Sequence, residues 1–352
     1  MEIEKSGAFL EKMWSCARLV CLYACRGVFS IGAKIISTTA NFSLMVLVLL
    51  LSSCSQNKPT PEQLNIGRDK IYKGQLNIDA DASLESIMKQ QLEVFQYLND
   101  SINIHVAYKH ETEMLDDLIN RKAGVLVLCR NLSKQEQDNL KTRDTLYVRE
   151  VKIAYDAVAL IGNLKFNDSK LDMNALKEYF DPANKSAVLP RMVFDDKGSS
   201  AVNYVLNLLG YNGQVSSRVS AVKSPLEVID YVAGNDNAIG FIPFNFISDE
   251  SEHRVKEIFK RIKVLSLRTK NQEAKEIRVS ANQSDIVTGD YPLIRTIHTE
   301  MRYSFEDSNE WNFVNFLFKE KGQRIFLRAG LIPATMPQRD IEVNTDGLKR
   351  SN

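Results

Sequence analysis

Histidine is scarce in this sequence, and its scarcity limits the chemistry of the chain. Only four of the 352 residues are histidines, and none has a second histidine or cysteine at the spacing of a metal site. Zinc sites in proteins use three or four such ligands, usually in short motifs. We therefore expect no metal site and no cofactor.

Cysteine is nearly absent from the body of the chain. Cys16, Cys21, Cys25 and Cys54 lie in the first sixth, and only Cys129 lies further along. This distribution excludes a disulfide framework for the globular part. The first three cysteines stand among apolar residues without a nearby histidine, which argues against a metal site there as well.

An excess of either charge is also lacking. The chain has 45 lysines and arginines against 44 aspartates and glutamates, so the formal net charge is +1. No overall field attracts nucleic acid, and we expect no nucleic-acid partner. Hydrophobic residues at 44% and charged residues at 25% are typical of globular proteins, and the length allows one large or two ordinary domains.

The apolar run Leu44–Leu51 is only eight residues long, whereas a membrane-spanning helix needs about 20. Such a run is typical of the core of a signal peptide. The sequence Leu51-Ser52-Ser53-Cys54 resembles the lipobox of bacterial lipoproteins, so we expect cleavage before Cys54 and a fatty acyl anchor on it. The alternative is a buried helix that ends in a cysteine, but the polar, proline-containing stretch 55–63 favours a tether.

The segment before this run is longer than usual for a signal peptide. A second apolar run occupies residues 13–23. Either translation starts further downstream or the leader is unusual. We assign residues 1–53 to the leader and residues 54–74 to the lipidated cysteine and its tether.

The rest of the chain shows two runs of alternating strand and helix patterns. In the first run, strands at 75–79, 102–106 and 125–129 alternate with helices at 84–98 and 111–124. In the second run, which follows a long strand at 147–162, helices begin after Asp172, Ser199 and Ser224, and strands lie near 192–196, 219–222 and 238–244. Each run predicts a parallel sheet covered by helices.

The C-terminal part is expected to complete the first lobe. We predict a helix from Tyr291 and an amphipathic stretch over 309–331 whose aromatic residues face the core. Two α/β lobes joined by extended segments would leave a ligand cleft between them. The predicted boundaries are 75–156 for the first part of lobe 1, 157–263 for lobe 2, and 264–352 for the completion of lobe 1.

Polar groups gather at the ends of predicted strands. Ser83 follows the first strand, and Gly198, Ser199 and Ser200 follow the strand at 192–196. The first amides of a helix lack intrahelical partners and attract anions. Arg130 ends a buried strand, where open α/β sheets place ligands, and a guanidinium suits an oxyanion. We predict that these five residues form an anion site.

Each of these residues also has a structural interpretation. Serine is common at helix N-caps, and an arginine at a strand end can be a surface residue. Asp156 stands inside an apolar strand, where we expect a hydrogen-bonded hinge residue more than a ligand contact. Asp195 and Asp196 are interpreted as solvated turn residues.

Several stretches together resemble the phosphate-binding component of the high-affinity phosphate ABC transporter, in the same order and spacing over roughly the whole chain after Cys54. They are LCRNLSKQE, KIAYDAVALIGN, DDKGSSAVNYVL, NAIGFIPF, GDYPLIR and FLFKEKGQRIFLRAGLIP. The resemblance implies an α/β protein of the type II periplasmic-binding-protein fold. In that fold two α/β lobes, joined by a hinge, close on an oxyanion in the cleft between them.

The resemblance also implies roles for single residues in the first lobe. Ser83 stands at the turn that supplies a hydroxyl and an amide to the ligand. Arg130 matches the arginine of the family's Ser-Ser-Arg-x-Leu variant, with Cys129 in place of the second serine. The Gly-Ser pair that usually precedes the second helix is missing, since the chain reads His110-Glu111 nearby.

In the second lobe, Gly198 and Ser199 match the first two residues of the family's Gly-Ser-Gly-Thr turn. Ser200 and Ala201 replace the other two. The family's arginine four residues before that serine is replaced by Asp195.

The expected function is solute binding and not catalysis. The resemblance implies a lipid-anchored protein on the periplasmic side of a bacterial membrane, which captures inorganic phosphate or a related oxyanion and delivers it to ABC permease subunits. KGSSA is not the G-x-S-x-G elbow of a serine hydrolase, and no histidine sits in a recognisable partner motif. The alternative is a lipid-anchored sensor or scaffold that keeps the fold but does not serve transport.

Overall fold

The computed structural model describes residues 72–143, 145–186, 188–211, 213–302 and 308–336. Cys54 and the predicted leader lie outside these residues, as does the tether up to residue 71. Within the described ranges no helix is both long enough and apolar enough to cross a membrane.

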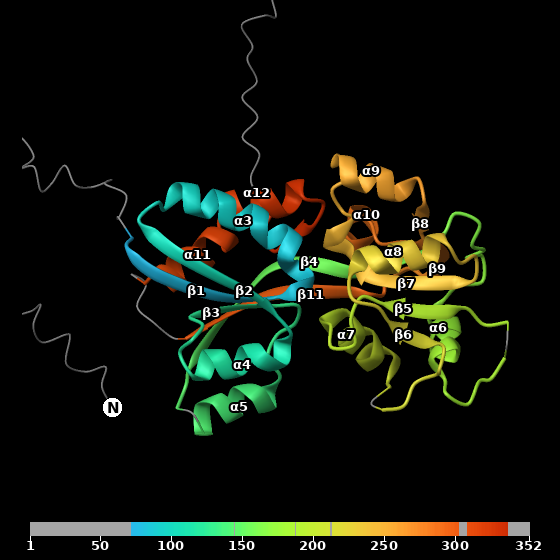
Figure 1. Cartoon of the computed structure of the whole chain (residues 1–352), viewed down its shortest axis with the longest axis horizontal. Coiled ribbons are helices and arrows are strands. Elements are labelled where there is room, and N and C mark those ends of the chain that lie inside the picture. Colours follow the sequence, from blue (N-terminus) through green and yellow to red (C-terminus); the bar gives the residue numbers. More distant parts are fainter. Residues whose placement is uncertain (1–71, 144, 187, 212, 303–307, 337–352) are drawn as a thin grey trace, which may run out of the picture. The chain divides into compact units, whose positions relative to one another are not determined.

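The central element is strand β4 (Val148–Asn163). Its first half pairs antiparallel with β11 (Ile294–Arg302), and its second half pairs antiparallel with β7 (Ala238–Pro243). The exchange of partners falls between Ala157, which pairs with β11, and Val158, which pairs with β7. One strand therefore belongs to two sets of strands (Figure 1).

The first set has the order β2-β1-β3-β11-β4, with β12 also paired to β4. Its other strands are β1 (Gly74–Asp81), β2 (Ile102–Lys109), β3 (Val125–Leu128) and β12 (Ile332–Pro333). The pairs β1–β2 and β1–β3 are parallel, as the strand–helix alternation predicts, whereas β11 is antiparallel to β3. The predicted parallel sheet is confirmed for β1, β2 and β3. Because β11 pairs antiparallel with β3 and β4, the sheet as a whole is mixed.

The second set has the order β4-β7-β5-β6, and β8 pairs with β4. Its other strands are β5 (Arg191–Phe194), β6 (Val219–Ala221) and β8 (Ile262–Val264). β5 is parallel to both β6 and β7. The carboxyl end of β5 therefore lies at the same edge of the sheet as the carboxyl ends of its two neighbours, where ligands of open α/β sheets bind.

Helices cover both faces of the first set (Figure 1). One face carries α3 (Glu85–Leu98), α11 (Asn309–Phe318) and α12 (Glu320–Arg328), and the other carries α4 (Glu111–Ile119) and α5 (Lys134–Arg143). Successive side chains of β3 point to opposite faces of the sheet, so this strand contributes to the core on both faces. Val125 and Val127 join the core under α3, while Leu126 and Leu128 join the cluster under α4 and α5.

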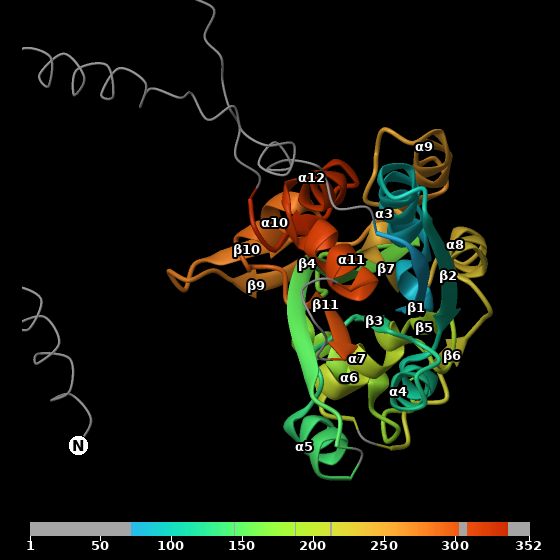
Figure 2. The same ribbon diagram turned by 90° about the vertical axis from the view of Figure 1, so that its left-hand side faces the viewer.

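Helices also pack on both faces of the second set. They are α6 (Met173–Phe180), α7 (Ser200–Leu209), α8 (Pro225–Ala233), α9 (His253–Phe259) and α10 (Gln283–Val287). A hairpin of β9 (Leu267–Lys270) and β10 (Glu276–Val279) projects from this set in Figure 2. Arg268 Nη2 in the hairpin lies 3.0 Å from Asp172 Oδ2, so the hairpin is fixed to the residue that caps α6.

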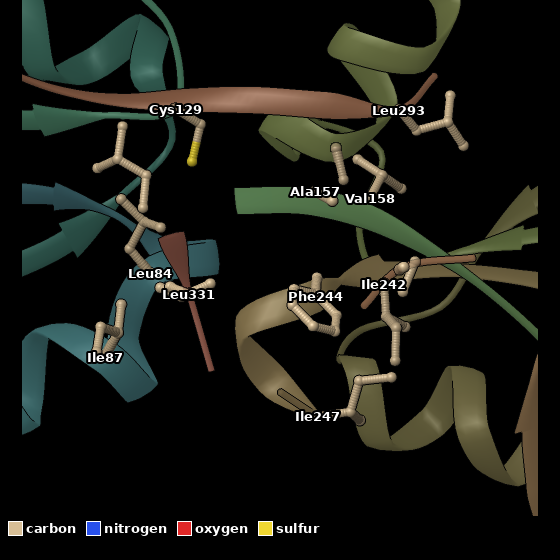
Figure 3. Close-up of a cluster of buried hydrophobic side chains, with 14 of the residues drawn as sticks. Leu84, Ile87, Cys129, Ala157, Val158, Ile242, Phe244, Ile247, Leu293 and Leu331 are labelled. Atoms are coloured by element: carbon tan, nitrogen blue, oxygen red, sulfur yellow. The ribbon is translucent and has the colours of Figure 1, made fainter. Parts of the chain in front are cut away.

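The apolar core is continuous where β4 changes partners. Ala157 and Val158 are fully buried and belong to one cluster with Leu84 of the first set and Ile242 of the second. Figure 3 shows these side chains on either side of β4. The two sets of strands are therefore joined by packing as well as by the shared strand.

One predicted helix is wrong, and this error affects the site. Residues after Tyr291 form strand β11 and not a helix. Ile294, Thr296, Ile297 and Thr299 supply the reason, because β-branched side chains favour strands. The predicted amphipathic stretch over 309–331 is present but divided into α11 and α12.

Candidate functional site

The turn after β1 is capped by Asp81. Its Oδ1 accepts a hydrogen bond from Ser83 N at 2.9 Å and so caps the short 3-10 helix η2 (Ala82–Leu84). The hydroxyl of Ser83 has no part in this cap. It lies 3.3 Å from Cys129 Sγ and 3.2 Å from Ser200 Oγ, which belongs to helix α7 of the second set.

The turn after β5 uses its two serines differently. Ser199 is the N-cap of α7, and its Oγ accepts from Val202 N at 3.3 Å. Ser200 is the first residue of α7, and its Oγ donates to Asp81 Oδ1 at 3.0 Å. The two predicted turns thus meet through Ser83 and Ser200. Gly198 lies at the edge of this turn, where its N–H donates to Asp196 Oδ1 at 2.8 Å.

An arginine that sequence reasoning missed completes the cluster. Arg295 on β11 donates from Nη1 to Ser200 Oγ at 2.8 Å and from Nη2 to Ser83 Oγ at 3.0 Å. Its exposed fraction is 2%. The cluster therefore combines two hydroxyls and one guanidinium from three elements that are far apart in the sequence.

The charge of Arg295 is balanced by Asp156 at the point where β4 changes partners. The carboxylate Oδ2 accepts from Nη2 at 2.7 Å and from Nε at 3.1 Å. Asn245 of the 3-10 helix η3 (Phe244–Phe246) donates to the same carboxylate from its backbone N and from Nδ2, both at 3.0 Å. The expectation that Asp156 is a hydrogen-bonded buried residue is confirmed, and these partners explain how a fully buried charge is tolerated.

Arg130, which was predicted to contact the ligand, pairs with two carboxylates in the structure. Its Nη1 and Nη2 each lie 2.9 Å from a carboxylate oxygen of Glu136, and its Nε lies 2.9 Å from Glu111 Oε2. The reason is helix α5, which the sequence analysis did not predict and which carries Glu136. The guanidinium that reaches Ser83 and Ser200 belongs to Arg295 instead.

Asp195 also differs from the prediction. It is 5% exposed and is therefore not a solvated turn residue. Burial raises the pKa of its carboxyl above the ordinary value, although a hydrogen bond with Ser199 and the charge of Arg295 oppose the shift. Asp196 fits the prediction better, because its side chain is 45% exposed.

The cluster is polar and carries charges of both signs. Ser83, Ser200 and Arg295 offer donors, and the carboxylates of Asp81 and Asp195 lie close by. Burial raises the pKa of the Cys129 thiol well above its usual range, so this cysteine is a neutral, unreactive neighbour. Among the described residues no group of three or more His, Cys, Asp or Glu side chains could hold a metal ion.

A cavity of about 680 Å³ adjoins the cluster. Asp81, Ser83, Asp195 and Ser199 line its inner end. Its walls come from the first two turns of α3, the start of α8, the end of η3 and the start of α9. The predicted cleft between two α/β lobes is therefore present. Of the five predicted site residues, Ser83 and Ser199 line it, whereas Arg130, Gly198 and Ser200 do not.

Comparisons with known proteins identify the fold. A family model described as a PBP superfamily domain matches residues 69–305. No curated protein sequence matches the chain.

Several solved structures are similar at low sequence identity. An ABC-type phosphate transport receptor from Vibrio cholerae has 17% identity, covers 73% of this chain and 99% of its own, and gives a TM-score of 0.58. A putative phosphate ABC transporter substrate-binding protein with bound phosphate from Clostridium perfringens has 19% identity, coverages of 74% and 100%, and a TM-score of 0.56. A possible phosphate binding protein from Planctomyces limnophilus has 16% identity, coverages of 75% and 94%, and a TM-score of 0.54.

At these identities the likeness establishes the fold, which is the predicted type II periplasmic-binding-protein fold. The family model spans about two thirds of the sequence, residues 69–305 of 352. The chain belongs to the PBP superfamily.

Proposed function

We propose that this protein is the solute-binding component of an ABC importer and that it captures an oxyanion, with phosphate the favoured ligand. The observation that carries the proposal is the cluster of Ser83, Ser200 and Arg295. Their polar groups meet at one point, although Ser83 follows β1, Ser200 follows β5 and Arg295 lies on β11. The buried guanidinium of Arg295 donates to both hydroxyls and so adds a positive charge next to the cavity that Ser83 lines, which favours an anionic ligand.

The neighbouring carboxylates favour phosphate over sulfate. Asp81 and Asp195 lie beside the donors and repel a fully ionised anion. Phosphate carries a proton at neutral pH and can donate it in a hydrogen bond to one of them, whereas sulfate carries none. The repulsion from these two carboxylates therefore supports selection of phosphate, which carries a proton, over sulfate.

Calorimetric titration of the full chain with phosphate and with sulfate tests the proposal. We expect phosphate to bind at least tenfold more tightly than sulfate. Ser83→Ala should weaken phosphate binding about tenfold, because Ser83 lines the cavity, one good hydrogen bond to a charged group is worth about 1.5 kcal/mol, and 1.4 kcal/mol is one decade. Ser101→Ala is the control, since the Ser101 hydroxyl is exposed and contacts only Asp100. Failure of both anions to bind below millimolar concentration would overturn the proposal.

We also propose that Cys54 carries a lipid anchor and holds the protein on the periplasmic side of a bacterial membrane. The support is the lipobox-like sequence before Cys54, which lies outside the described residues. Metabolic labelling with a fatty-acid analogue should mark the wild type and Cys129→Ser but not Cys54→Ser. Label that persists in Cys54→Ser would exclude this anchor.

A second candidate function rests on the same cluster. Asp81 already accepts from Ser83 N and Ser200 Oγ, so the two turns are bridged by the protein's own carboxylate. This closure favours a lipid-anchored sensor or scaffold that does not serve transport. A scaffold predicts that no small anion raises the unfolding temperature, whereas a solute-binding protein predicts a ligand-dependent increase. In neither case do we expect turnover of a phosphoester.

A further inference from the structure

In this conformation a ligand cannot contact Ser83, Ser200 and Arg295 at the same time, because these side chains bond to one another and to Asp156. Arg295 uses Nε, Nη1 and Nη2 on Asp156, Ser200 and Ser83. Ser200 and Arg295 do not line the cavity, whereas Ser83 and Ser199 do. A ligand that binds this conformation of the protein therefore lies in the cavity, against Ser83, Ser199 and the carboxylates of Asp81 and Asp195.

The cavity is much larger than an inorganic oxyanion. Its volume is about 680 Å³, in the range of roughly 300–1,000 Å³ that holds drug-sized molecules. A water molecule takes up about 30 Å³ in the liquid, and phosphate has only five non-hydrogen atoms. Inorganic phosphate would leave most of the space to solvent.

The walls of the cavity change character from its inner end outward. The inner end is polar, with hydroxyls and carboxylates from the two turns. Further out, Pro225 and Leu226 of α8 and Phe246 of η3 present apolar surface. The guanidinium of Arg254 lies 4.4 Å from the centroid of the Phe246 ring, so the two side chains of this wall pack on each other. Such a lining suits a molecule with one oxyanion end and one organic end.

The charges of the lining limit the number of phosphates. Five carboxylates line the cavity against two lysines and one arginine. Lys89 is paired with Glu85 at 2.6 Å and Arg254 with Glu252 at 2.9 Å, so little positive charge remains for a ligand. A polyphosphate would meet repulsion that a single phosphoryl group, carrying a proton to a carboxylate, would not.

We propose that the natural ligand is an organic phosphate with one phosphoryl group, such as the phosphate monoester of a small alcohol. This inference rests on the proposed function, because it places the phosphoryl group at the same inner end, against Ser83 and Ser199. The organic group occupies the outer cavity, between the first turn of α3 and the wall of Leu226 and Phe246.

Calorimetric titration of the full chain with inorganic phosphate, glycerol 3-phosphate and phenyl phosphate tests the inference. At least one monoester should bind tenfold or more tightly than inorganic phosphate. If inorganic phosphate binds and both monoesters bind no more tightly, this inference is wrong and the proposed function stands. If none of the three binds, both are wrong.

A matched pair of variants locates the organic group. Ser86 lies on α3 and lines the cavity, so Ser86→Trp should fill it and weaken monoester binding at least tenfold, with less than a twofold change for inorganic phosphate. Glu93→Trp is the control, because Glu93 lies on the same face of α3, two turns further along, is exposed, and does not line the cavity. Leu226→Trp fills the cavity from the opposite wall if Ser86→Trp fails to fold. Unchanged monoester binding in a folded variant overturns the inference.

Discussion

Arg295 and Arg130 both form ion pairs with carboxylates, but Arg295 is buried and Arg130 is partly exposed to solvent. The side chain of Arg295 is 1% exposed and that of Arg130 is 39% exposed. Each makes contacts of about 3 Å or less through three guanidinium nitrogens. The difference is water, because a buried charge depends on its partners and an exposed charge can be hydrated instead. An arginine that matches a motif is therefore not necessarily the one on which the site depends.

Loss of the buried arginine should have the largest effect. Arg295→Met leaves Asp156 charged and buried without its cation, and breaking such a pair costs about 3–5 kcal/mol. We expect a loss of this size in the free energy of unfolding, measured by urea denaturation. Arg324→Met is the control, because Arg324 is 60% exposed and pairs only with Glu320 one turn away.

A double variant sharpens this test. Arg295→Met combined with Asp156→Asn removes both charges, and part of the lost stability should return. If the double variant is as unstable as the sum of the single variants, Arg295 and Asp156 do not act as a pair.

Removal of one hydroxyl from the cluster should have the next largest effect on stability. Ser200→Ala leaves Arg295 Nη1 without its buried acceptor and Asp81 with one donor fewer, at a cost of about 1–3 kcal/mol. Ser199→Ala removes a helix cap instead, at about 1 kcal/mol. Urea denaturation of both variants compares the two serines. A smaller loss for Ser200→Ala than for Ser199→Ala would contradict the assignment of the Ser200 hydroxyl to the cluster.

Glu300 lies on the same strand as Arg295, but it is a buried acid that keeps its proton, whereas Arg295 is a buried charge held by a partner. Glu300 is fully buried, and burial together with the nearby Glu150 raises its pKa to about 8. The native state keeps this proton while the unfolded state loses it near pH 4.5. The contribution of Glu300 to stability is therefore complete below that pH, and it falls as the pH rises towards 8, by at most about 1.4 kcal/mol per pH unit.

Glu300→Gln cannot ionise and should lack this slope. Urea denaturation of both proteins at several pH values between about 5 and 8 measures it. We expect the stability of the wild type to fall relative to the variant as the pH rises. Parallel pH profiles would show that Glu300 does not hold a proton in the folded state.

The exposed arginine should contribute least. Arg130→Met removes an ion pair that is partly hydrated, and such pairs contribute about 1 kcal/mol or less. We expect a loss of stability well below that of Arg295→Met, and less than a threefold change in affinity for phosphate. An affinity loss of tenfold or more for Arg130→Met would restore Arg130 to the ligand site and break the comparison.

The sequence predicted those features of the candidate site that depend on a few consecutive residues. Asp172 and Ser224 were predicted as helix N-caps, and the turn of Gly198, Ser199 and Ser200 was predicted to cap a third helix. In the structure Asp172, Ser224 and Ser199 are the N-caps, and each side chain accepts a hydrogen bond from an amide in the first turn of its helix. A cap is determined by three or four consecutive residues. The fold class was predictable for a similar reason, since the strand–helix alternation repeats along the chain.

The missed parts depend on contacts between distant segments. Arg295 lies 95 residues from Ser200 and 212 residues from Ser83 in the sequence. The predicted helix from Tyr291 concealed it, although the β-branched residues around it were the available signal for a strand. Asp81 was recognisable as a turn residue, but its contact with Ser200 depends on how the two sets of strands come together.

The position of β11 between β3 and β4 has a consequence for the order of folding. β3 and β4 end at Leu128 and Asn163, but the strand that fills the space between them ends only at Arg302. A growing chain therefore exposes two unpaired strand edges until most of its length is available, and such edges promote aggregation. Pairing over so many residues is slow. The cluster of Ser83, Ser200 and Arg295 cannot form before this last central strand is inserted, because the same strand carries Arg295.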